Sequence, residues 1–326
     1  AVWRDELFLE LHRGCATSRP DQKRHNRTLE RLLREADAAS ALLALAGRDG
    51  GGSDWRPLLF QQFHDILPGT SIPEVFEQAE PVWRSARRQA RQERDRRLAR
   101  LPRQEDAAAA WSWWGLQPLA FWSPLVRLPA GSWSADGVSL PQQAAAGGGA
   151  WVQLPRQHGS CSVPLRREPG MASCAAQPRQ PVVITSLGAG VWRLGNGLID
   201  LDVSAAGLMA LRDRDGRNQL SSPLQLERYR DRGEFWDAWD LAADYRSQPL
   251  GVLGTDSLEW LDQGPLVAHL VLRRQLGASC MRLDLRLKAD TAWLELICSI
   301  NWCQTHELLR LDLPLATPAV RIAADT

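Results

Sequence analysis

The sequence has little tyrosine, no closely paired cysteines and no long apolar run. It contains 2 Tyr against 15 Trp among its 326 residues. A transmembrane helix needs about 20 mainly apolar residues, and no segment approaches that length. The net charge of +1 argues against a globally basic nucleic-acid-binding protein. We therefore expect neither a membrane nor a nucleic acid as a partner.

The cysteines show no CxxC pair and no zinc-finger spacing, so they predict neither a redox motif nor a structural zinc site. Thinly spread cysteines in a large chain fit reduced thiols and a cytoplasmic location. The six residues are Cys15, Cys161, Cys174, Cys280, Cys298 and Cys303.

The length is enough for about two or three domains. The chain begins at Ala1 without an initiator methionine and ends at Thr326, directly after a strand-like run. We therefore expect both ends to have been cut from a longer protein.

The part before Pro102 has a helical pattern. Ser18 and Ser71 are each followed three residues later by an acidic residue, which suggests a capping box at the start of a helix. Apolar residues then recur at steps of three and four, as on the buried face of a helix. We expect helices from about Ser18 to the glycines after position 46, from Ser53 to His64, and from Ser71 to Leu101, packed as an antiparallel three-helix bundle.

The part after Pro102 has a β pattern. Residues 103–181 are rich in Pro, Gly, Ala and Trp, and predict a linker with a small β region that includes strands at Leu125–Leu128 and Trp151–Leu154. From Val182 onward, short strands follow one another, with hairpin signals at Asn196-Gly197 and Asp215-Gly216. The expected strands are Val182–Thr185, Val191–Leu194, Leu198–Val203, Leu208–Asp213, Leu224–Tyr229, Leu266–Gln275, Met281–Leu287, Trp293–Ile300 and Leu308–Leu313. The predicted fold class is α+β multidomain, a three-helix bundle followed by a large antiparallel β-sandwich, incomplete within residues 182–326.

A histidine and an aspartate stand side by side at the expected end of the second helix, in Gln61–Thr70 (QQFHDILPGT). A helix end would let His64 face a cleft, while Asp65 would point about 100° away, so the two are poor candidates for equivalent ligands of one metal. A lone histidine is more often a structural residue. The other histidines form no HxH or HExxH pair: His12, His25, His158, His269 and His306. A catalytic zinc needs about three protein ligands, so no complete zinc site can be assembled from this chain.

Two further segments allow two interpretations each. The segment Trp236–Asp240 (WDAWD) suits sugar binding, or a turn packed between β layers. The arginine-rich third helix, from Arg84 to Arg103, could bind an anion or a nucleic acid. Glu93 and Asp95 interrupt the run and no aromatic residue interleaves it, which favours a solvated helix face.

Several motifs in order resemble glycoside hydrolase family 38 α-mannosidases. The string QFHDILPGTSI is similar to the family signature, and Glu6–Gly14 (ELFLELHRG) resembles the segment leading into its helical domain. WDAWD resembles a motif of the bacterial and cytosolic branch, and Asn301–Pro314 is similar to a later family strand. One departure is Ala16, where the family commonly has an aromatic residue.

The resemblance implies specific roles for residues of this chain. His64 would ligate zinc or another divalent metal, and Asp65 would contact mannose hydroxyls. Arg13 would face the sugar pocket or the surface, and Trp236, Asp237 and Asp240 are further candidate substrate contacts. The remaining ligands, the nucleophile and the acid/base carboxyl group belong in the family to an N-terminal catalytic barrel, of which residues 1–20 would be the tail and 21–102 the following bundle.

The resemblance also implies an activity. The family hydrolyses terminal α-D-mannosyl residues of oligosaccharides or glycosides by double displacement with retention. This chain would supply one metal ligand and no catalytic carboxylate, so we expect it to be inactive alone. The alternative is a non-catalytic carbohydrate-binding or scaffolding module. The sequence leaves a homo-oligomeric assembly open.

Overall fold

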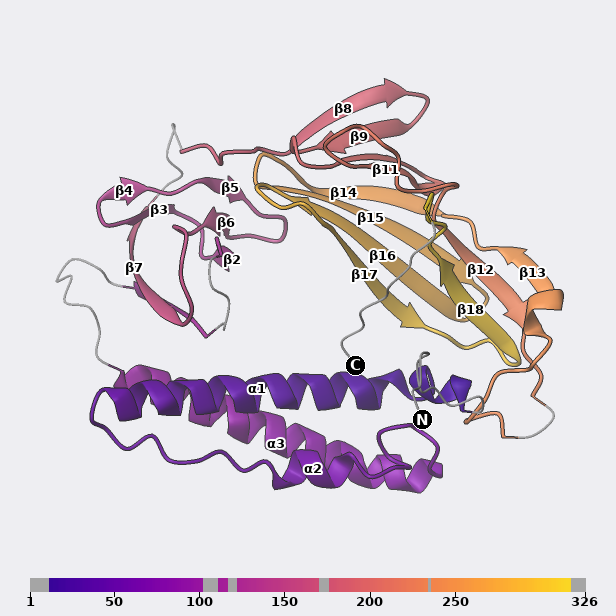
Figure 1. The fold of residues 1–326 in the computed structure, drawn as a ribbon, viewed down its shortest axis with the longest axis horizontal. Coiled ribbons are helices and arrows are strands. Elements are labelled where there is room, and N and C mark those ends of the chain that lie inside the picture. Colours follow the sequence, from indigo (N-terminus) through magenta and orange to yellow (C-terminus); the bar gives the residue numbers. More distant parts are fainter. Residues whose placement is uncertain (1–11, 102–110, 117–121, 170–175, 234–235, 318–326) are drawn as a thin grey trace, which may run out of the picture.

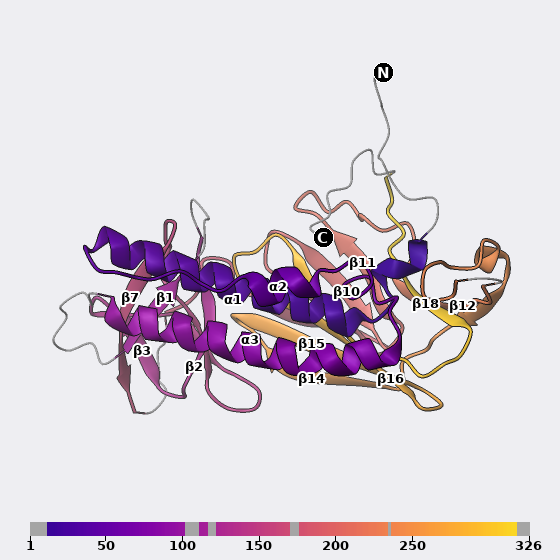
Figure 2. The same cartoon turned by 90° about the horizontal axis from the view of Figure 1, so that it is seen from below.

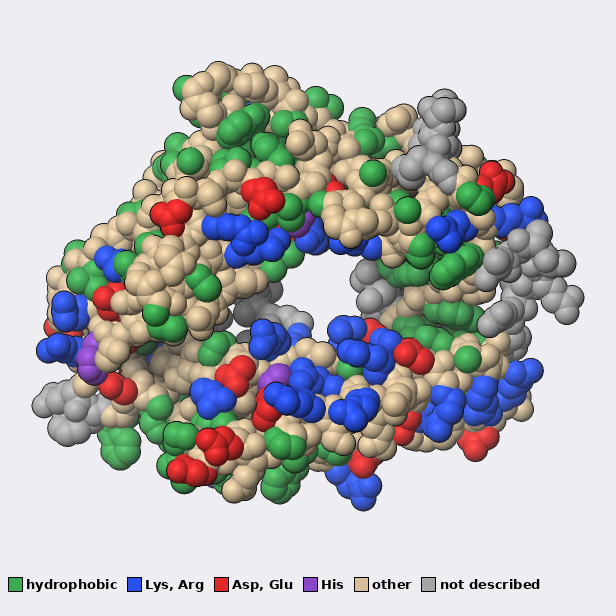
Figure 3. Space-filling model, turned by 180° about the vertical axis from the view of Figure 1, so that it is seen from behind, with side chains coloured by type: hydrophobic (Ala, Val, Ile, Leu, Met, Phe, Trp, Pro, Cys, Tyr) green, Lys and Arg blue, Asp and Glu red, His purple; other side chains and the backbone are tan. Residues whose placement is uncertain are grey.

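The chain forms a layer of helices that faces a set of β-sheets (Figure 1). The space-filling view shows an opening between the two (Figure 3). The computed structural model describes residues 12–101, 111–116, 122–169, 176–233 and 236–317, so the family-like segment before His12 lies outside the described residues. A 3₁₀ turn, η1, precedes the helices. The helical elements are η1 (Arg13–Ala16), α1 (Pro20–Leu45), α2 (Arg56–Gln61) and α3 (Pro73–Arg100).

Helix α1 packs through the apolar face that its spacing predicts. Helices α2 and α3 do so in part, because Leu59, Phe63 and Val82 of their expected apolar stripes are exposed. The core between them is made by residues of α1, α2 and α3 together with Ile66, which follows α2. Trp83 of α3 is fully buried, and its indole N–H donates to the side-chain oxygen of Gln22 on α1 at 2.8 Å. This bond satisfies two polar groups that the bundle would otherwise bury unpaired.

Both predicted capping boxes are wrong. The residues at the N-caps of α1 and α3 are Arg19 and Ile72, and neither makes a side-chain cap. The hydroxyl of Ser18 donates instead to the carbonyl of Ala238 at 2.7 Å, and that of Ser71 donates to the carbonyl of Asp65 at 2.9 Å. The hydroxyl of Ser18 therefore binds a distant segment and that of Ser71 binds the preceding turn, so neither caps a helix.

The second helix is shorter than predicted. It ends at Gln61 rather than at His64, so the His-Asp pair lies in the turn that follows. The amide of Ile66 donates to the carbonyl of Phe63 at 2.9 Å, and the amides of Thr70 and Ser71 both donate to the carbonyl of Asp65. These hydrogen bonds form a turn in place of a further helical turn. The directions of the His64 and Asp65 side chains are therefore set by the turn and not by helical geometry.

The small β region contains two sheets. Apart from the predicted strands β2 and β6, its strands were not expected. One sheet has the order β1 (Trp111–Gly115), β7 (Cys161–Glu168), β3 (Ser132–Ala135), β4 (Val138–Ser139). The other has the order β2 (Leu125–Leu128), β6 (Ala150–Gln153), β5 (Gln142–Ala144).

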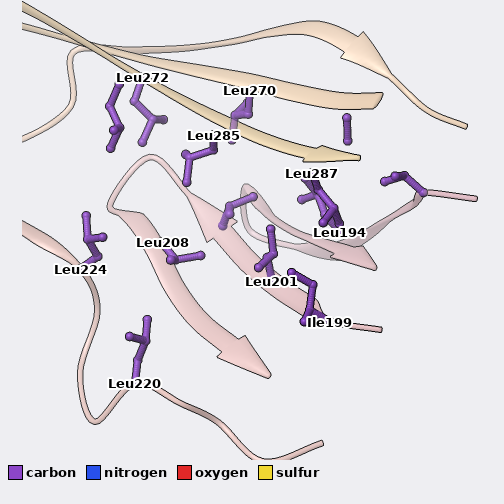
Figure 4. Packing of buried hydrophobic residues seen from close by; sticks show 14 residues of the cluster. Leu194, Ile199, Leu201, Leu208, Leu220, Leu224, Leu270, Leu272, Leu285 and Leu287 are labelled. Atoms are coloured by element: carbon purple, nitrogen blue, oxygen red, sulfur yellow. The ribbon is translucent and has the colours of Figure 1, made fainter. Parts of the chain in front are cut away.

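Two four-stranded sheets make the main β-sandwich. One has the order β11 (Gly207–Arg212), β10 (Asp200–Ser204), β9 (Val191–Gly195), β8 (Val183–Gly188). The other has the order β14 (Ser257–Gln263), β15 (Val267–Leu276), β16 (Ser279–Lys288), β17 (Leu294–Asn301). Leucines from the facing sheets fill the space between them, as Leu201, Leu208, Leu270 and Leu285 show (Figure 4). The α+β prediction is confirmed.

A third sheet in the part of the chain after residue 182 has the order β13 (Pro249–Val252), β12 (Gln225–Arg230), β18 (Glu307–Asp312). The strands on either side of Asn196-Gly197 pair as antiparallel neighbours, as the hairpin signal predicts. A short 3₁₀ turn, η2 (Tyr245–Ser247), precedes β13.

The helices lie across the strand half, with the small β region near one end of the bundle and β12 and β18 near the other (Figure 2). Gln143 joins the small β region to β15, because its amide donates to the carbonyl of Val267 at 3.1 Å and its oxygen accepts the amide of Leu266 at 2.8 Å. None of the described helices is long and apolar enough to cross a membrane.

Candidate functional site

The turn after α2 carries the predicted ligand at the surface. The side chain of His64 is 75% exposed, and its Nε2 lies 3.4 Å from Oδ2 of Asp65, whose side chain is 33% exposed. The ring of Phe63 packs against the imidazole with centroids 4.2 Å apart. The turn therefore presents an accessible nitrogen next to a carboxylate.

Asp65 is held in place by the residues that follow it. Its Oδ1 accepts a hydrogen bond from the hydroxyl of Thr70 at 3.0 Å. Its carbonyl accepts the amides of Thr70 at 3.1 Å and Ser71 at 3.0 Å. Since Oδ1 and the carbonyl are engaged within the turn, Oδ2 is the oxygen directed toward His64.

Lys23 ties this turn to the start of α1. Its ammonium donates to the carbonyl of Pro68 at 2.7 Å and also to the carbonyl of Ser18. Gly69 has φ +85°, and a Cβ there would lie 2.6 Å from the Ser18 carbonyl oxygen, so no larger residue fits this approach. Burial lowers the pKa of Lys23. The His-Asp turn is thus fixed against residues 18 and 19.

The same start of α1 is joined to the WDAWD segment. The amide of Gly14 donates to the carbonyl of Trp239 at 3.0 Å. The Ser18 hydroxyl bonds to Ala238, as described above, and a Cβ on Gly14 would lie 3.1 Å from the backbone of Asp240. The ring of His12 stacks near that of Trp239, with centroids 4.7 Å apart.

Arg13 and Asp240, both predicted to contact substrate, contact each other. Nε of Arg13 lies 2.8 Å from Oδ1 of Asp240, and its Nη2 donates to the carbonyl of Leu241 at 3.0 Å. The hydrogen bond from Arg13 lowers the pKa of Asp240. Trp236 is 75% exposed, and Asp237 is exposed beside it. Within this segment, Trp236 and Asp237 therefore offer the freer side chains.

Three motifs that lie far apart in the sequence are in contact: the His-Asp turn, the segment of residues 13–18 and the WDAWD segment. The His-Asp turn contacts residues 18 and 19 through Lys23 and Gly69, and residues 14 and 18 contact the WDAWD segment. The described residues contain no group of three His, Cys, Asp or Glu that could hold a metal. As an exposed imidazole beside a carboxylate, His64 has the chemistry of a divalent-metal ligand.

We expect Lys23→Met to loosen the His-Asp turn. The change removes two charge-assisted hydrogen bonds and should lower the free energy of unfolding by about 1.5 kcal/mol. It should also speed amide exchange in residues 64–71 beyond any global effect. Hydrogen exchange with mass spectrometry measures this, and Arg24→Met, at the neighbouring exposed position, is the control. Equal exchange in both variants would show that Lys23 does not hold the turn.

Comparison with known families gives two matches to the chain. The model of the α-mannosidase middle domain matches residues 10–101, and that of the glycosyl hydrolases family 38 C-terminal domain matches residues 194–326. Together they cover more than half of the sequence. The chain belongs to glycoside hydrolase family 38. The family resemblance of its motifs is confirmed.

Among the relatives of this family 38 chain, α-mannosidase 2C1 of Homo sapiens is 26% identical over 330 residues, covering 96% of the chain and 30% of the relative. Alpha-mannosidase G of Dictyostelium discoideum is 37% identical over 79 residues, covering 23% of the chain and 7% of the relative. The chain thus spans about 30% of the length of the human relative.

A solved structure supports the fold. The crystal structure of an α-mannosidase from Enterococcus faecalis V583 matches with a TM-score of 0.63 at 14% identity, covering 91% of this chain and 43% of that one. At this identity the likeness concerns the fold alone.

Sequence reasoning found the three motifs but missed what joins them. Lys23 was noted only as part of the family-like segment. The sequence does contain a signal for a structural role of Lys23. This residue is one of two lysines in an arginine-rich chain, and it lies in the first turn of a helix. A cation there opposes the helix dipole, so a tertiary partner could have been inferred. The roles of Ser18 and Gly69 could not, because they depend on contacts between distant segments.

Proposed function

We propose that this chain is part of a retaining α-mannosidase that hydrolyses terminal α-D-mannosyl residues of oligosaccharides or glycosides with a divalent metal. The observation that carries the proposal is the His64-Asp65 turn of a family 38 chain, with an imidazole 75% exposed and 3.4 Å from a carboxylate oxygen. In this proposal His64 ligates the metal, zinc by preference, and Asp65 contacts mannose hydroxyls.

The metal would orient the mannose ring through its hydroxyls and stabilise developing charge. The residues of this chain would do the rest of the positioning. His64 would bind as the neutral imidazole. Thr70 and Ser71 would keep Asp65 directed toward the sugar, and Lys23 would hold the turn as a unit. Trp236 and Asp237 would lie at the rim, where the indole can stack on a sugar face.

Apolar side chains around the turn support a longer protein. Leu59, Phe60, Phe63 and Ile72 are each more than half exposed, at 60%, 72%, 52% and 64%. An apolar group of this kind next to candidate ligands is typical of a surface that another domain covers. We propose that a preceding catalytic domain covers it and brings the nucleophile, the acid/base carboxyl group and the other metal ligands.

The described cysteines are free thiols, which fits the proposed cytoplasmic location: Cys15, Cys161, Cys280, Cys298 and Cys303. The arginines of α3 are partly neutralised within the chain. Arg84 pairs with Glu80 at 2.7 Å and Arg94 with Glu35 at 2.7 Å, while Arg97 is buried. These contacts favour the solvated helix face over a nucleic-acid surface.

A carbohydrate-binding module is the second candidate, supported by exposed Trp236 beside Asp237. One experiment separates the two. The protein extended by the coding region upstream of Ala1 is incubated with an aryl α-mannoside, and the anomer formed first is followed by NMR. We expect hydrolysis with release of α-mannose, and none from residues 1–326 alone. Mannoside binding without hydrolysis by the extended protein would support the binding module, and release of β-mannose would exclude a retaining enzyme.

A further inference from the structure

A buried histidine lies between two buried aspartates on the sheet of β14 to β17. His269 of β15 is opposite Asp262 of β14 in the strand register, and Asp284 belongs to β16 on the other side. The exposed fractions of the three residues are 5%, 6% and 4%. Ala268 and Leu270, on either side of the histidine in sequence, belong to the leucine core. Because side chains alternate along a strand, His269 projects from the opposite face of the sheet.

Both ring nitrogens of His269 face a carboxylate. Nε2 lies 2.6 Å from Oδ1 of Asp284, and Nδ1 lies 3.6 Å from Oδ2 of Asp262. A neutral imidazole has one N–H and one lone pair, so in either tautomer the lone pair would face a carboxylate oxygen. Only the ring that is protonated on both nitrogens presents a donor to each acid.

The charges of this cluster balance with that second proton. Burial raises the pKa of Asp284, but the hydrogen bonds from Arg282 and His269 outweigh burial and keep it below its ordinary value. Arg282 donates to the two oxygens of Asp284 at 2.8 and 2.6 Å. Two aspartates and one arginine leave one negative charge in excess, and a buried charge without a counter-ion is costly. A protonated imidazole brings the sum to zero.

The other charged groups that face this cluster are engaged elsewhere. Arg286 of β16 is opposite the histidine in the register and pairs with Glu295 of β17 at 3.3 Å. Lys288 of β16 pairs with the same glutamate. Arg127 of β2 donates through Nη2 to the carbonyl of Ala146 at 2.7 Å. The imidazole therefore remains as the counter-charge of the two aspartates.

The same cluster holds the small β region. Oδ1 of Asp262 accepts the amide of Ala146 at 2.8 Å, in the loop between β5 and β6. Ala145 of this loop belongs to an apolar cluster with Leu266 and Val267, next to this contact. Asp262 thus binds the loop with one oxygen and faces the histidine with the other. Without the Nδ1 proton, a lone pair would face that second oxygen and weaken the position of the carboxylate.

We propose that His269 is a proton-dependent lock for the loop of residues 145–149. The ring is protonated on both nitrogens when the small β region is docked, and release of the Nδ1 proton as the pH rises loosens the loop. The stabilisation is therefore present at neutral pH and lost at alkaline pH. The lock needs neither a metal nor mannosidase activity, so it stands or falls independently of the proposed function.

The charge of the ring is measured by NMR on the chain labelled with ¹⁵N-histidine. His269→Gln removes one set of ring signals and so assigns them. We expect both ring nitrogens of His269 to resonate in the protonated range at pH 7, and one of them to leave this range as the pH is raised. A ring nitrogen in the unprotonated range at pH 7 would overturn the proposal.

Hydrogen exchange with mass spectrometry tests the coupling to the loop. After correction for intrinsic rates, exchange of residues 145–149 in the wild type should rise about tenfold between pH 7 and pH 10, the size expected when a hydrogen bond to a charged group is lost. Asp262→Asn keeps an oxygen for the amide of Ala146 but removes the charge that faces the ring. The loop of this variant should therefore show little dependence on pH.

Glu259→Gln is the matched control, since it removes an exposed carboxylate from the same strand and should behave like the wild type. Exchange in the wild-type loop that does not change with pH would contradict the lock. Equal pH dependence in Asp262→Asn and Glu259→Gln would contradict it as well. If Asp262→Asn does not fold, the ring signals of the wild type decide.

Discussion

Replacement of Asp284 by alanine is expected to lower the free energy of unfolding by about 3–5 kcal/mol. Asp284 is 4% exposed on β16. Its Oδ1 lies 2.6 Å from Nε2 of His269 on β15, and Arg282 donates to its two oxygens at 2.6 and 2.8 Å. Nδ1 of His269 lies 3.6 Å from Oδ2 of Asp262 on β14. The substitution would leave the buried imidazole of His269 and the guanidinium of Arg282 without their common partner.

The direction of the pKa shift of Asp284 agrees with a stabilising network. Burial alone would raise it, but the hydrogen bonds from Arg282 and His269 outweigh burial, so the pKa lies below its ordinary value. The control is Glu259→Ala, which removes an exposed pair with Arg273 on the same sheet, separated by 3.4 Å. Exposed pairs contribute less than about 1 kcal/mol. Equal losses for the two variants in urea unfolding would show that the network does not stabilise the sheet.

His64→Ala is expected to lower the mannosidase activity of the extended protein by more than about 100-fold. Loss of groups that merely orient a metal ligand already costs about 10 to 100-fold in affinity or activity, and removal of a ligand should cost more. Because the side chain is 75% exposed, its loss removes little packing, so the folded structure should persist. The measurement is kcat/KM on an aryl α-mannoside, with circular dichroism to verify folding.

His158→Ala provides the matched control for this prediction. His158 is also exposed, but it lies between β6 and β7 in the small β region. We expect its activity to stay within about twofold of the wild type, since surface substitutions away from special features change little. A small loss in His64→Ala, comparable to that of His158→Ala, would remove His64 from the site.

The long elements could be predicted from the sequence because burial imposes a period on them. The apolar spacing of α1 and α3 and the leucine-rich β15 and β16 all lie where the pattern places them. The missed strands are short or atypical. Strand β7 contains Pro164, which usually excludes a strand from a sheet interior. Strand β14 contains buried Asp262 near its end, and an aspartate is expected at the surface until His269 is known to lie beside it.

The site could be predicted only as a set of separate motifs. The sequence identifies His64, Asp65, Arg13 and the WDAWD segment, but it does not show that Arg13 and Asp240 bind each other. Nor does it show that Ser18, which looks like a helix cap, binds Ala238 across more than 200 residues. Such contacts depend on how the helical and strand halves meet, and local sequence patterns carry no information about that meeting.

The metal content of purified protein tests the ligand assignment most directly. The extended wild type, His64→Ala and His158→Ala are dialysed against zinc-free buffer, and bound zinc is quantified by mass spectrometry. We expect about one zinc per chain in the wild type and in His158→Ala, and a loss in His64→Ala that parallels its loss of activity. Full zinc occupancy in His64→Ala would contradict the assignment.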